Sequence, residues 1–228
     1  IMASEKNRLQ KVLEDANIKL TAVVSEVDGV SSMNMIQALL TKDKLTREEI
    51  KAMVHGKLRC KIDQLVEALN GKLTDHHRFL LKFHLENIAF MAEQIQELDE
   101  EIAKRMIPFQ KESHLIQTIP GISTTTASAI IAEIGVDMSQ FPDATHLSSW
   151  AGICPGNNES AGVKKSGKIR KGNKFLKATL TEAAWSASKR KGSAYNAIYN
   201  NIAKRRGKKR ALVALAHQIL VDIYRVLK

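Results

Sequence analysis

Apolar residues recur every three or four positions along most of the chain, which is the spacing of one face of an α-helix. The first such segment runs from Ala3 to about Val27 and ends before Gly29. Its apolar positions on one face are Leu9, Val12, Leu13, Ala16, Leu20, Val23 and Val24. Only four prolines occur, and alternating β-branched runs are few. The pattern therefore predicts a mostly α fold.

Capping and stop residues divide the rest of the chain into further helices. Ser31 or Ser32 can cap a helix that reaches Leu40, and Thr46 with Glu49 forms a capping-box pattern. The later helices are predicted over about 46–56, 58–69, 75–107, 172–190, 193–206 and 208–227. Short helices and glycine-containing loops are expected after Pro108.

The longest predicted helix, from near Asp75 to just before Pro108, carries a heptad repeat that we call the seam. The seam consists of Leu81, Leu85, Ile88, Ala92 and Ile95, with Leu98 and Ile102 continuing after a slip. This spacing is typical of a coiled coil or an antiparallel helix pair. It also fits a helix of a monomeric bundle, and the residues leave both open.

Charge divides the chain more sharply than hydropathy does. The 228 residues carry a formal charge of +11. Residues 1–114 hold 17 Lys and Arg against 18 Asp and Glu, a net of −1; residues 115–228 hold 18 against 6, a net of +12. We therefore expect two segments, a helical and coiled-coil segment over about 1–107 and a basic domain over 108–228 that meets a polyanion.

Composition excludes several other classes of protein. Aromatic residues make up only 5% of the chain, which argues against an aromatic-stacking platform for RNA. Cys60 and Cys154 form no metal-binding spacing, so no zinc site and no disulfide scaffold are expected. The apolar runs are too short to span a bilayer, and no signal peptide is visible. We expect a cytoplasmic protein, and the start at Ile1 suggests a fragment.

The first motif with chemical meaning is LIQTIPGISTTTASAIIAEIG, residues 115–135. Pro120-Gly121 separates two apolar helical patterns, as in a helix-hairpin-helix, and Ala127 is the small residue at the predicted helix crossing. Gly121 permits the sharp turn, and Ser123, where the usual motif has a second glycine, can cap the second helix. Free amides at that helix start can hold a phosphate, so Gly121 and Ser123 are predicted to contact DNA. A simple helical hairpin without a ligand is the alternative.

The second motif is the loop PGNNESAGVKKSGKIRKGN, residues 155–173, which places two serines, Ser160 and Ser166, among basic residues. The segment VKKSGKIR can form a small β-hairpin with Ser166-Gly167 at its turn. A serine nucleophile needs activation, and nearby cations stabilise the charge of a phosphoryl transition state. The basic residues available to contact DNA are Lys164, Lys165, Lys168, Arg170, Lys171 and Lys174. From the residues alone, a turn-capping serine and a nucleophile both remain open.

Two further basic runs follow, SKRKGS at 188–193 and AKRRGKKRA at 203–211. In the second run, Arg205, Arg206, Lys208 and Lys209 are predicted to contact phosphates. A charge run is often only a solvated helix face, but two runs after the serine loop favour nucleic acid.

The combination of these motifs, with WAGICP, KGN and LKATLTEAAW between residues 150 and 185, resembles the C-terminal domain of DEDD-type insertion-sequence transposases. These recombinases are related to the Piv DNA invertase, and many are guided by a bridge RNA. The resemblance covers essentially the whole chain. It extends back through NRLQKVLEDANIKL, GKLRCKIDQLVEAL and TDHHRFLL, and forward through YNNIAKRRGKKRALVALAHQIL.

The resemblance implies a mechanism and partners. Family members begin with a RuvC-like nuclease domain whose four acids bind Mg²⁺; this sequence has no such segment, and no metal site is expected within it. Ser160 matches the family's serine nucleophile, which forms a phosphoserine link with DNA, although Ala161 stands between Ser160 and the glycine that usually follows. The expected partners are double-stranded DNA, a guide RNA and further copies of the chain in a dimer or tetramer. The expected function is DNA strand exchange by transesterification, with the fragment alone inactive; the alternatives are a non-catalytic DNA- or RNA-binding module and a purely oligomerising helical scaffold.

Overall fold

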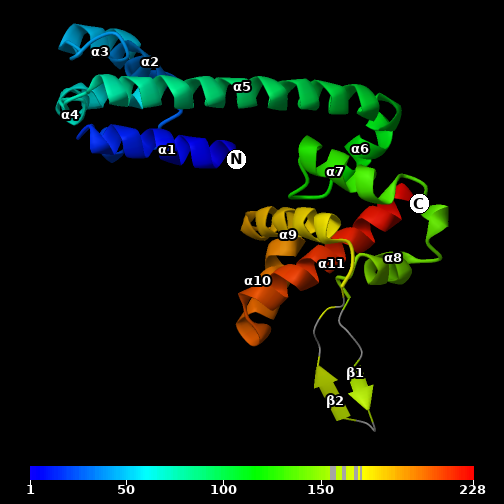
Figure 1. Ribbon diagram of the computed structural model, residues 1–228. Helices are drawn as coiled ribbons and strands as arrows, with labels where there is room; N and C mark the ends of the chain where they lie inside the picture. The colour runs from blue at the N-terminus through cyan, green and yellow to red at the C-terminus, as the bar shows by residue number, and fades with distance from the viewer. Residues whose placement is uncertain (155–157, 161–162, 167–168, 170) are drawn as a thin grey trace. The chain divides into compact units, whose positions relative to one another are not determined.

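The computed structural model describes residues 1–154, 158–160, 163–166, 169 and 171–228. Within these residues the chain is mostly helical, which confirms the predicted fold class (Figure 1). It divides into two compact units, which we call unit 1 (Ile1–Glu100) and unit 2 (Glu101–Lys228). The division lies inside one long helix, α5 (Asp75–Met106), whereas the sequence analysis placed a boundary at 107/108. No helix in the described part of the chain is both long enough and apolar enough to cross a membrane.

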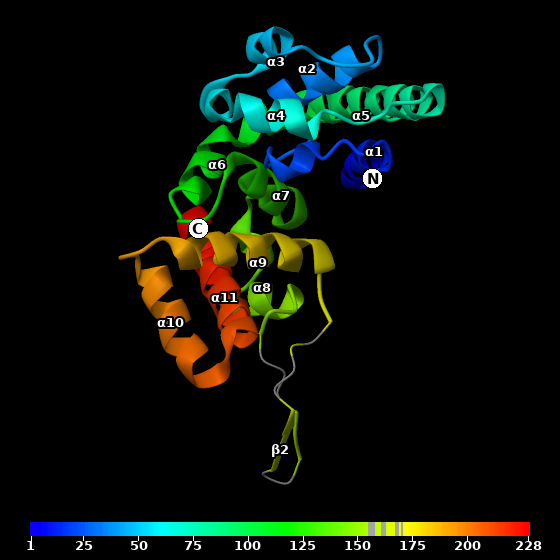
Figure 2. The same ribbon diagram turned by 90° about the vertical axis from the view of Figure 1, so that its left-hand side faces the viewer.

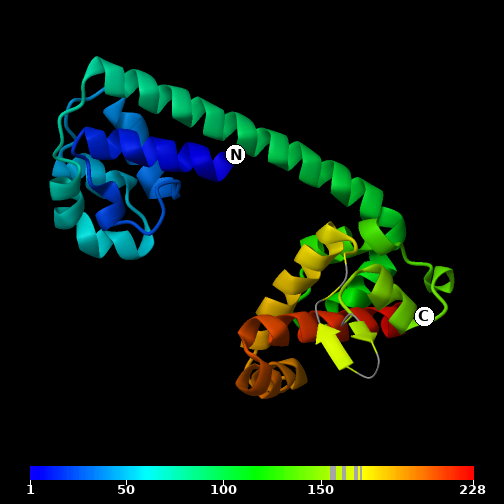
Figure 3. The same ribbon diagram turned by 60° about the horizontal axis from the view of Figure 1, so that its bottom comes forward.

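Unit 1 is a small helical domain built around the N-terminal part of α5. Its other elements are α1 (Met2–Asp15), the 3₁₀ helix η1 (Leu20–Ala22), α2 (Val30–Leu39), α3 (Arg47–Met53), the 3₁₀ helix η2 (Gly56–Lys61) and α4 (Ile62–Ala68). Figure 3 shows α1 running beside the N-terminal part of α5. The two helices are joined by a hydrogen bond of 2.8 Å between His84 and Glu5, both of which are buried.

The predicted helix over residues 3–27 is wrong in its length. The helix α1 ends at Asp15, and Asn17 has a left-handed backbone with φ of 57°. A short polar side chain tolerates that conformation, which an α-helix cannot contain. Leu20 and Val24 are nevertheless buried in the same core. Val23 is only partly buried, so the apolar spacing identified six buried positions among its seven but not the conformation between them.

The two predicted caps in unit 1 differ in outcome. The capping box of Thr46 and Glu49 at the start of α3 is confirmed, with both reciprocal hydrogen bonds present. Ser31 and Ser32 do not cap α2, because the helix begins at Val30, before either of them. The Ser32 hydroxyl instead donates to the carbonyl of Glu26, and the Ser31 hydroxyl accepts from the amide of residue 55. The predicted helix over 58–69 is also split, into η2 and α4.

The seam on α5 has two halves with different surroundings. Leu81, Leu85 and Ile88 are buried in the core of unit 1, as a helix of a monomeric bundle would have them. The later positions are exposed: Ile95 by 47%, Leu98 by 63% and Ile102 by 46%. Only this second half presents apolar side chains to solvent.

Unit 2 contains the remaining helices and a two-stranded sheet. After the 3₁₀ helix η3 (Ile107–Phe109) come α6 (Gln110–Gln117), α7 (Thr124–Ile134), the 3₁₀ helix η4 (Met138–Gln140), α8 (Ala144–Trp150), β1 (Asn158–Ser160), β2 (Val163–Ser166), α9 (Lys174–Lys189), α10 (Ala194–Arg206) and α11 (Lys208–Leu227). The last three helices lie within two residues of their predicted bounds. Figure 2 shows α9 crossing α11 inside unit 2. Their apolar faces form the core together with α6, α7 and α8, through Ile116, Ile130, Leu147, Leu176, Leu180, Leu215 and Ile219.

The two strands pair in an antiparallel ladder, but not in the predicted place. Asn158 pairs with Ser166 and Ser160 pairs with Val163. Ser166 thus belongs to a strand and not to the predicted turn, and Gly167 lies outside the described residues. The prediction missed that the residues before 161 form the first strand.

Candidate nucleic-acid interface and serine loop

The turn between α6 and α7 is held against α9. Gly121 has a φ of 93°, which disfavours any side chain, and a Cβ atom there would lie 2.3 Å from the carbonyl oxygen of Ala183. The glycine is therefore required by close packing on α9 as well as by the turn. Ser123 caps α7, since its hydroxyl accepts from the amide of Thr126 at 3.2 Å, and its side chain is exposed. Ala127 is fully buried, in agreement with the small residue expected there.

The serine loop leaves and re-enters unit 2 at a point that we call the loop stem, formed by Ala151-Gly152 and Gly172-Asn173. A Cβ atom on Gly172 would lie 2.5 Å from the amide nitrogen of Gly152, so the two backbones touch. Gly152 itself has a φ of 71°. Close backbone contact of this kind accepts only glycine at residue 172. The glycines in WAG and KGN are thus explained by the stem.

Asn173 fixes the stem to the two helices beside it. Its side-chain oxygen accepts from the amides of Phe175 and Leu176, both at 3.0 Å, and so caps α9. Its side-chain nitrogen donates to the carboxylate of Glu133 on α7. Sequence reasoning did not identify this Glu133–Asn173 contact. Forty residues separate the two, and no short-range pattern connects them.

The predicted nucleophile and most of its basic neighbours lie on the loop beyond the stem. Ser160 is the last residue of β1 and pairs with Val163 of β2. Lys164 and Lys165 lie in β2. Lys168 and Arg170, like Ala161 and Gly162, lie outside the described residues. The structure thus describes Ser160 by its place at the end of a strand.

The acids of unit 2 that could hold a metal ion are engaged elsewhere. Asp143 caps α8 through the amides of residues 145 and 146, and the hydrogen bond from His146 holds the pKa of Asp143 below its usual value. Asp137 binds Ser139 in the same way, with its pKa also lowered. Glu133 binds Asn173. Across the described ranges no group of three or more His, Cys, Asp or Glu is arranged to hold a metal. These donors do not fit a Mg²⁺ site, and no step through a metal is derived from this chain.

Basic side chains cluster at two helix starts of unit 2. Lys171 and Lys174 are exposed where α9 begins. At the other site, Gly207, with a φ of 85°, joins α10 directly to α11. The exposed basic residues around it are Lys204, Arg205, Arg206, Lys208, Lys209 and Arg210, and we call this group the basic corner.

The positive charge of the basic corner is unfavourable at the start of α11. A helix N-terminus carries partial positive charge and is stabilised by acids, yet the first turn of α11 has three cations and no acid. Among the described residues, no salt bridge involves any member of the basic corner. The basic corner therefore carries a local electrostatic cost that no salt bridge among the described residues offsets.

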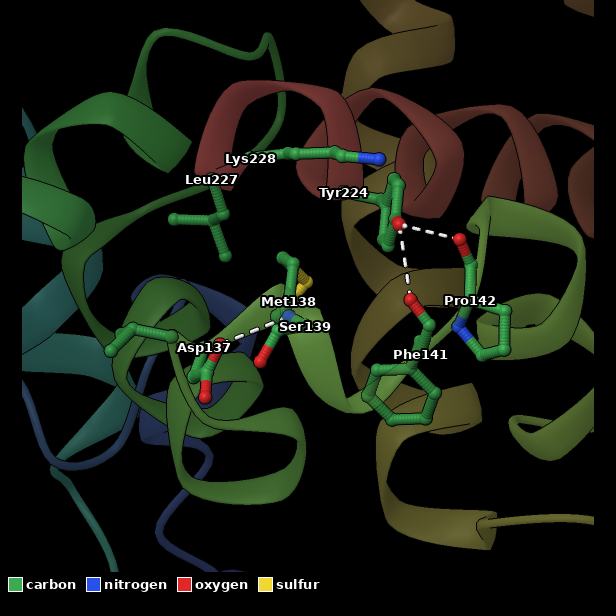
Figure 4. A pocket seen from close by; sticks show the side chains of 9 residues that line it. Asp137, Met138, Ser139, Phe141, Pro142, Tyr224, Leu227 and Lys228 are labelled. Carbon is green, nitrogen blue, oxygen red and sulfur yellow. Dashed lines mark hydrogen bonds between the residues drawn. The ribbon is translucent and has the colours of Figure 1, made fainter.

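A separate pocket of about 460 Å³ lies at the C-terminal end of α11 (Figure 4). Tyr224 lines it, and its hydroxyl donates to the carbonyl of Phe141 at 3.1 Å. Asp137, on the opposite side, accepts from the Ser139 amide at 2.9 Å. These polar groups are used to hold the chain around η4 together, and we assign no chemistry to this pocket.

Sequence reasoning missed the exposure of two aromatic residues on α9. Phe175 and Trp185 are 63% and 48% exposed, although the helix is packed on its opposite face. Their positions relative to the buried Leu176 and Leu180 could have indicated this, because residues 175 and 185 fall outside the apolar stripe of α9.

Comparison with known proteins found a matching family model and several relatives. Residues 113–200 match the family model described as the Transposase IS116/IS110/IS902 family. The chain is 28% identical over 149 residues to the pilin gene-inverting protein of Moraxella bovis, covering 63% of this chain and 46% of that protein. It is 30% identical over 131 residues to the transposase for insertion sequence element IS1111A of Coxiella burnetii, covering 55% of this chain and 35% of that protein. The chain thus spans less than half the length of these curated relatives. Residues 113–200, which hold the α6–α7 turn, the loop stem, α9 and the start of α10, form a region similar to the IS116/IS110/IS902 transposases.

Proposed function

We propose that this chain is part of a DNA transposase or site-specific recombinase, and that unit 2 binds double-stranded DNA in the bacterial nucleoid. The match of residues 113–200 to a transposase family carries the proposal. The exposed cations of the basic corner support it, because duplex DNA supplies anions, and these side chains have no carboxylate partner among the described residues. The α6–α7 turn then acts as a helix-hairpin-helix, with Gly121 and Ser123 near a phosphate.

DNA binding is tested by measuring the affinity of the chain for a duplex at several salt concentrations. Each phosphate contact contributes about 0.9 to the slope of log affinity against log salt. We expect a steep slope that falls when Arg205, Arg206, Lys208 and Lys209 are changed to Gln. Weak binding with a flat slope would instead favour a helical scaffold that only oligomerises.

The proposed chemistry is transesterification by Ser160. The Ser160 hydroxyl oxygen attacks a DNA phosphorus and forms a serine–phosphate ester. The bond from that phosphorus to a deoxyribose oxygen breaks, and the leaving oxygen takes up a proton as the serine loses its own. Lys164, Lys165 and Lys171 would stabilise the charge on the transferred phosphoryl group. Mg²⁺ belongs, by the same proposal, to acids of a RuvC-like domain in a longer protein.

The nucleophile is tested in a longer protein that includes such an acid-bearing domain. We expect Ser160→Ala to abolish the covalent protein–DNA adduct seen on a denaturing gel, while duplex affinity stays unchanged. Ser166→Ala, six residues on, is the matched control and should retain the adduct. Adduct formation and strand exchange by the Ser160→Ala protein would leave the alternative, a binding module without chemistry in this chain.

The exposed half of the seam supports assembly of the chain into dimers or tetramers. Ile95, Leu98 and Ile102 repeat at heptad spacing and are about half exposed, as a coiled-coil surface would be before it pairs. A guide RNA is a further partner within this proposal, and loss of strand exchange after RNase treatment would test it.

A further inference from the structure

The exposed face of α9 is unusual for a helix packed in a small domain. One side of α9 is buried through Leu176, Leu180, Ala183, Ala184 and Ala187. The other side, which we call the α9 face, exposes Lys174, Phe175, Ala178, Glu182, Trp185 and Lys189. Its two aromatic rings are ten residues apart, or about 15 Å along the axis at 1.5 Å per residue. Figure 2 shows the whole length of this helix.

Each aromatic ring on the α9 face has a lysine over it. The Lys174 ammonium lies 5.0 Å from the centroid of the Phe175 ring, and the Lys189 ammonium lies 4.1 Å from that of Trp185. In the described part of unit 2 no lysine forms a salt bridge. Glu182 is the one acid on the face. The face thus combines flat apolar surfaces with unneutralised positive charge.

We propose that the α9 face binds unpaired nucleobases of a single-stranded nucleic-acid segment. The bases stack on Phe175 and Trp185, and the phosphates that flank these bases meet Lys174 and Lys189. This proposal rests on the proposed function, since it takes unit 2 to bind nucleic acid, and it adds the state of the strand. The bases of an intact duplex are stacked on one another, so only an opened strand can offer their faces.

The spacing and the chemistry of the face agree with this ligand. A separation of about 15 Å corresponds to about four nucleotides at 3.4 Å per stacked nucleotide. Base–aromatic stacking tolerates any sequence, because every base has a flat face. A protein partner fits less well, because lysine is depleted in protein–protein interfaces. The 5% aromatic content argued against such a platform, yet one of the chain's two tryptophans lies on this single face.

The test uses the full chain in a Trp150→Phe background, which leaves Trp185 as its only tryptophan. The probes are an oligothymidylate of about 12 nucleotides, within the site sizes of single-strand binders, an abasic oligomer of equal length, and a duplex. We expect oligothymidylate to quench Trp185 fluorescence and the abasic oligomer to leave it unchanged. Quenching of the same size by both oligomers would overturn the proposal.

Substitutions then separate stacking from charge. Trp185→Leu or Phe175→Leu should weaken oligothymidylate binding roughly 5- to 100-fold, from the known range of stacking energies. The affinity of these Leu variants for duplex DNA, and the salt slope of that duplex binding, should stay unchanged. Trp185→Phe should retain most of the affinity for oligothymidylate. Lys189→Gln should lower the salt slope of oligothymidylate binding. Phe90→Leu is the matched control, because Phe90 is 61% exposed on α5 in unit 1, and it should have no effect.

A melting curve of each variant checks that it is folded. Two outcomes with folded variants would overturn the proposal. In one, the Leu variants bind oligothymidylate like the parent. In the other, they change self-association in sedimentation but not single-strand binding, which would make the face a contact between copies. Duplex binding with its salt slope reports on the proposed function separately, so loss of that binding alone would count against the proposed function.

Discussion

Unit 1 and unit 2 use their charged side chains in different ways. In unit 1, ion pairs connect separate elements: Lys6 with Asp28, Arg47 with Asp63 and Arg78 with Asp43. In the described part of unit 2, the recorded pairs involve Arg105, His146 and Arg225, each with an acid three or four residues away. The acids of unit 2 mostly hold backbone or polar groups, as Asp143 and Glu133 do.

The basic character of residues 115–228 comes from a low number of acidic residues and not from a high number of basic ones. Residues 1–114 and 115–228 hold almost equal numbers of basic residues, 17 and 18. The acids fall from 18 to 6. Cations that would find partners in the first half therefore remain available to an external polyanion in the second.

The largest effect is expected from Gly121→Ala, which should unfold unit 2 selectively. Its positive φ costs an L-residue about 1–2 kcal/mol, and overpacking against Ala183 adds about 1–3 kcal/mol. Gly192→Ala is the control, since Gly192 has a φ of 78° but nothing within 4 Å of the added atom. Urea unfolding followed by hydrogen exchange in each unit measures both. Equal losses in the two variants would mean that the contact with α9 is not formed.

The two halves of the seam should respond oppositely to the same substitution. Leu85 is buried in unit 1, so Leu85→Ala should lower the free energy of unfolding by about 2–5 kcal/mol. Leu98 is 63% exposed, so Leu98→Ala should change it by less than about 0.5 kcal/mol. Leu98→Ala should instead weaken self-association in sedimentation at rising concentration. Unchanged self-association would show that the exposed half of the seam is not a contact between copies of the chain.

These contrasts also show how far the sequence predicts the structure. The bounds of α11 were predictable because Gly207 interrupts two helical patterns. The end of α1 was not, because the left-handed turn at Asn17 lies inside an apolar spacing that continues past it. The heptad spacing of α5 could not reveal that Leu85 faces a core and Leu98 does not. That distinction depends on which other elements reach each part of the helix.

The contacts that hold the loop stem could not be predicted from the sequence. The glycines of WAG and KGN stood out in the sequence, and the match over 113–200 includes both. Glycine is required in both motifs because the backbones at Gly152 and Gly172, which are far apart in sequence, are in contact. The Glu133–Asn173 contact is non-local in the same way. Ser160 itself stays a prediction.

Neutralising one cation in each unit should separate stability from binding. Arg78 pairs with Asp43 and donates to the carbonyl of Leu39 at 3.0 Å, so Arg78→Gln should cost about 1 kcal/mol of stability and leave duplex affinity unchanged. Lys208→Gln should reduce the salt slope of duplex binding by about 0.9. It should leave stability unchanged or raise it by up to about 1 kcal/mol, because it removes a cation from the start of α11. If Arg78→Gln weakened duplex binding and Lys208→Gln did not, the cations of unit 2 would not be the ones that bind DNA.

The smallest effect concerns acid stability and the groups that hold each carboxylate. In unit 1, the hydrogen bond from Lys42, with help from the Thr46 amide, lowers the pKa of Glu49 from 4.5 to about 2. A lowered pKa means that the folded state favours the ionised form, so this stabilisation is complete above about pH 4.5 and is lost as the pH falls toward 2. Glu49→Gln should remove that pH dependence. In unit 2, the backbone amide of His146, and after it the His146 side chain, lowers the pKa of Asp143. Asp143→Asn, which can also cap α8, should remove the pH dependence there.

Salt distinguishes the two carboxylates. An ion pair with an exposed lysine is screened by added salt, whereas a carboxylate held by amides at a helix start depends less on a distant charge. The free energy of unfolding should therefore be measured between pH 2 and 5 at low and at high salt. High salt should reduce the stabilisation from Glu49 more than the stabilisation from Asp143. Equal losses would show that the acids of unit 2 also depend on its cations, and that those cations are less available to DNA than their exposure indicates.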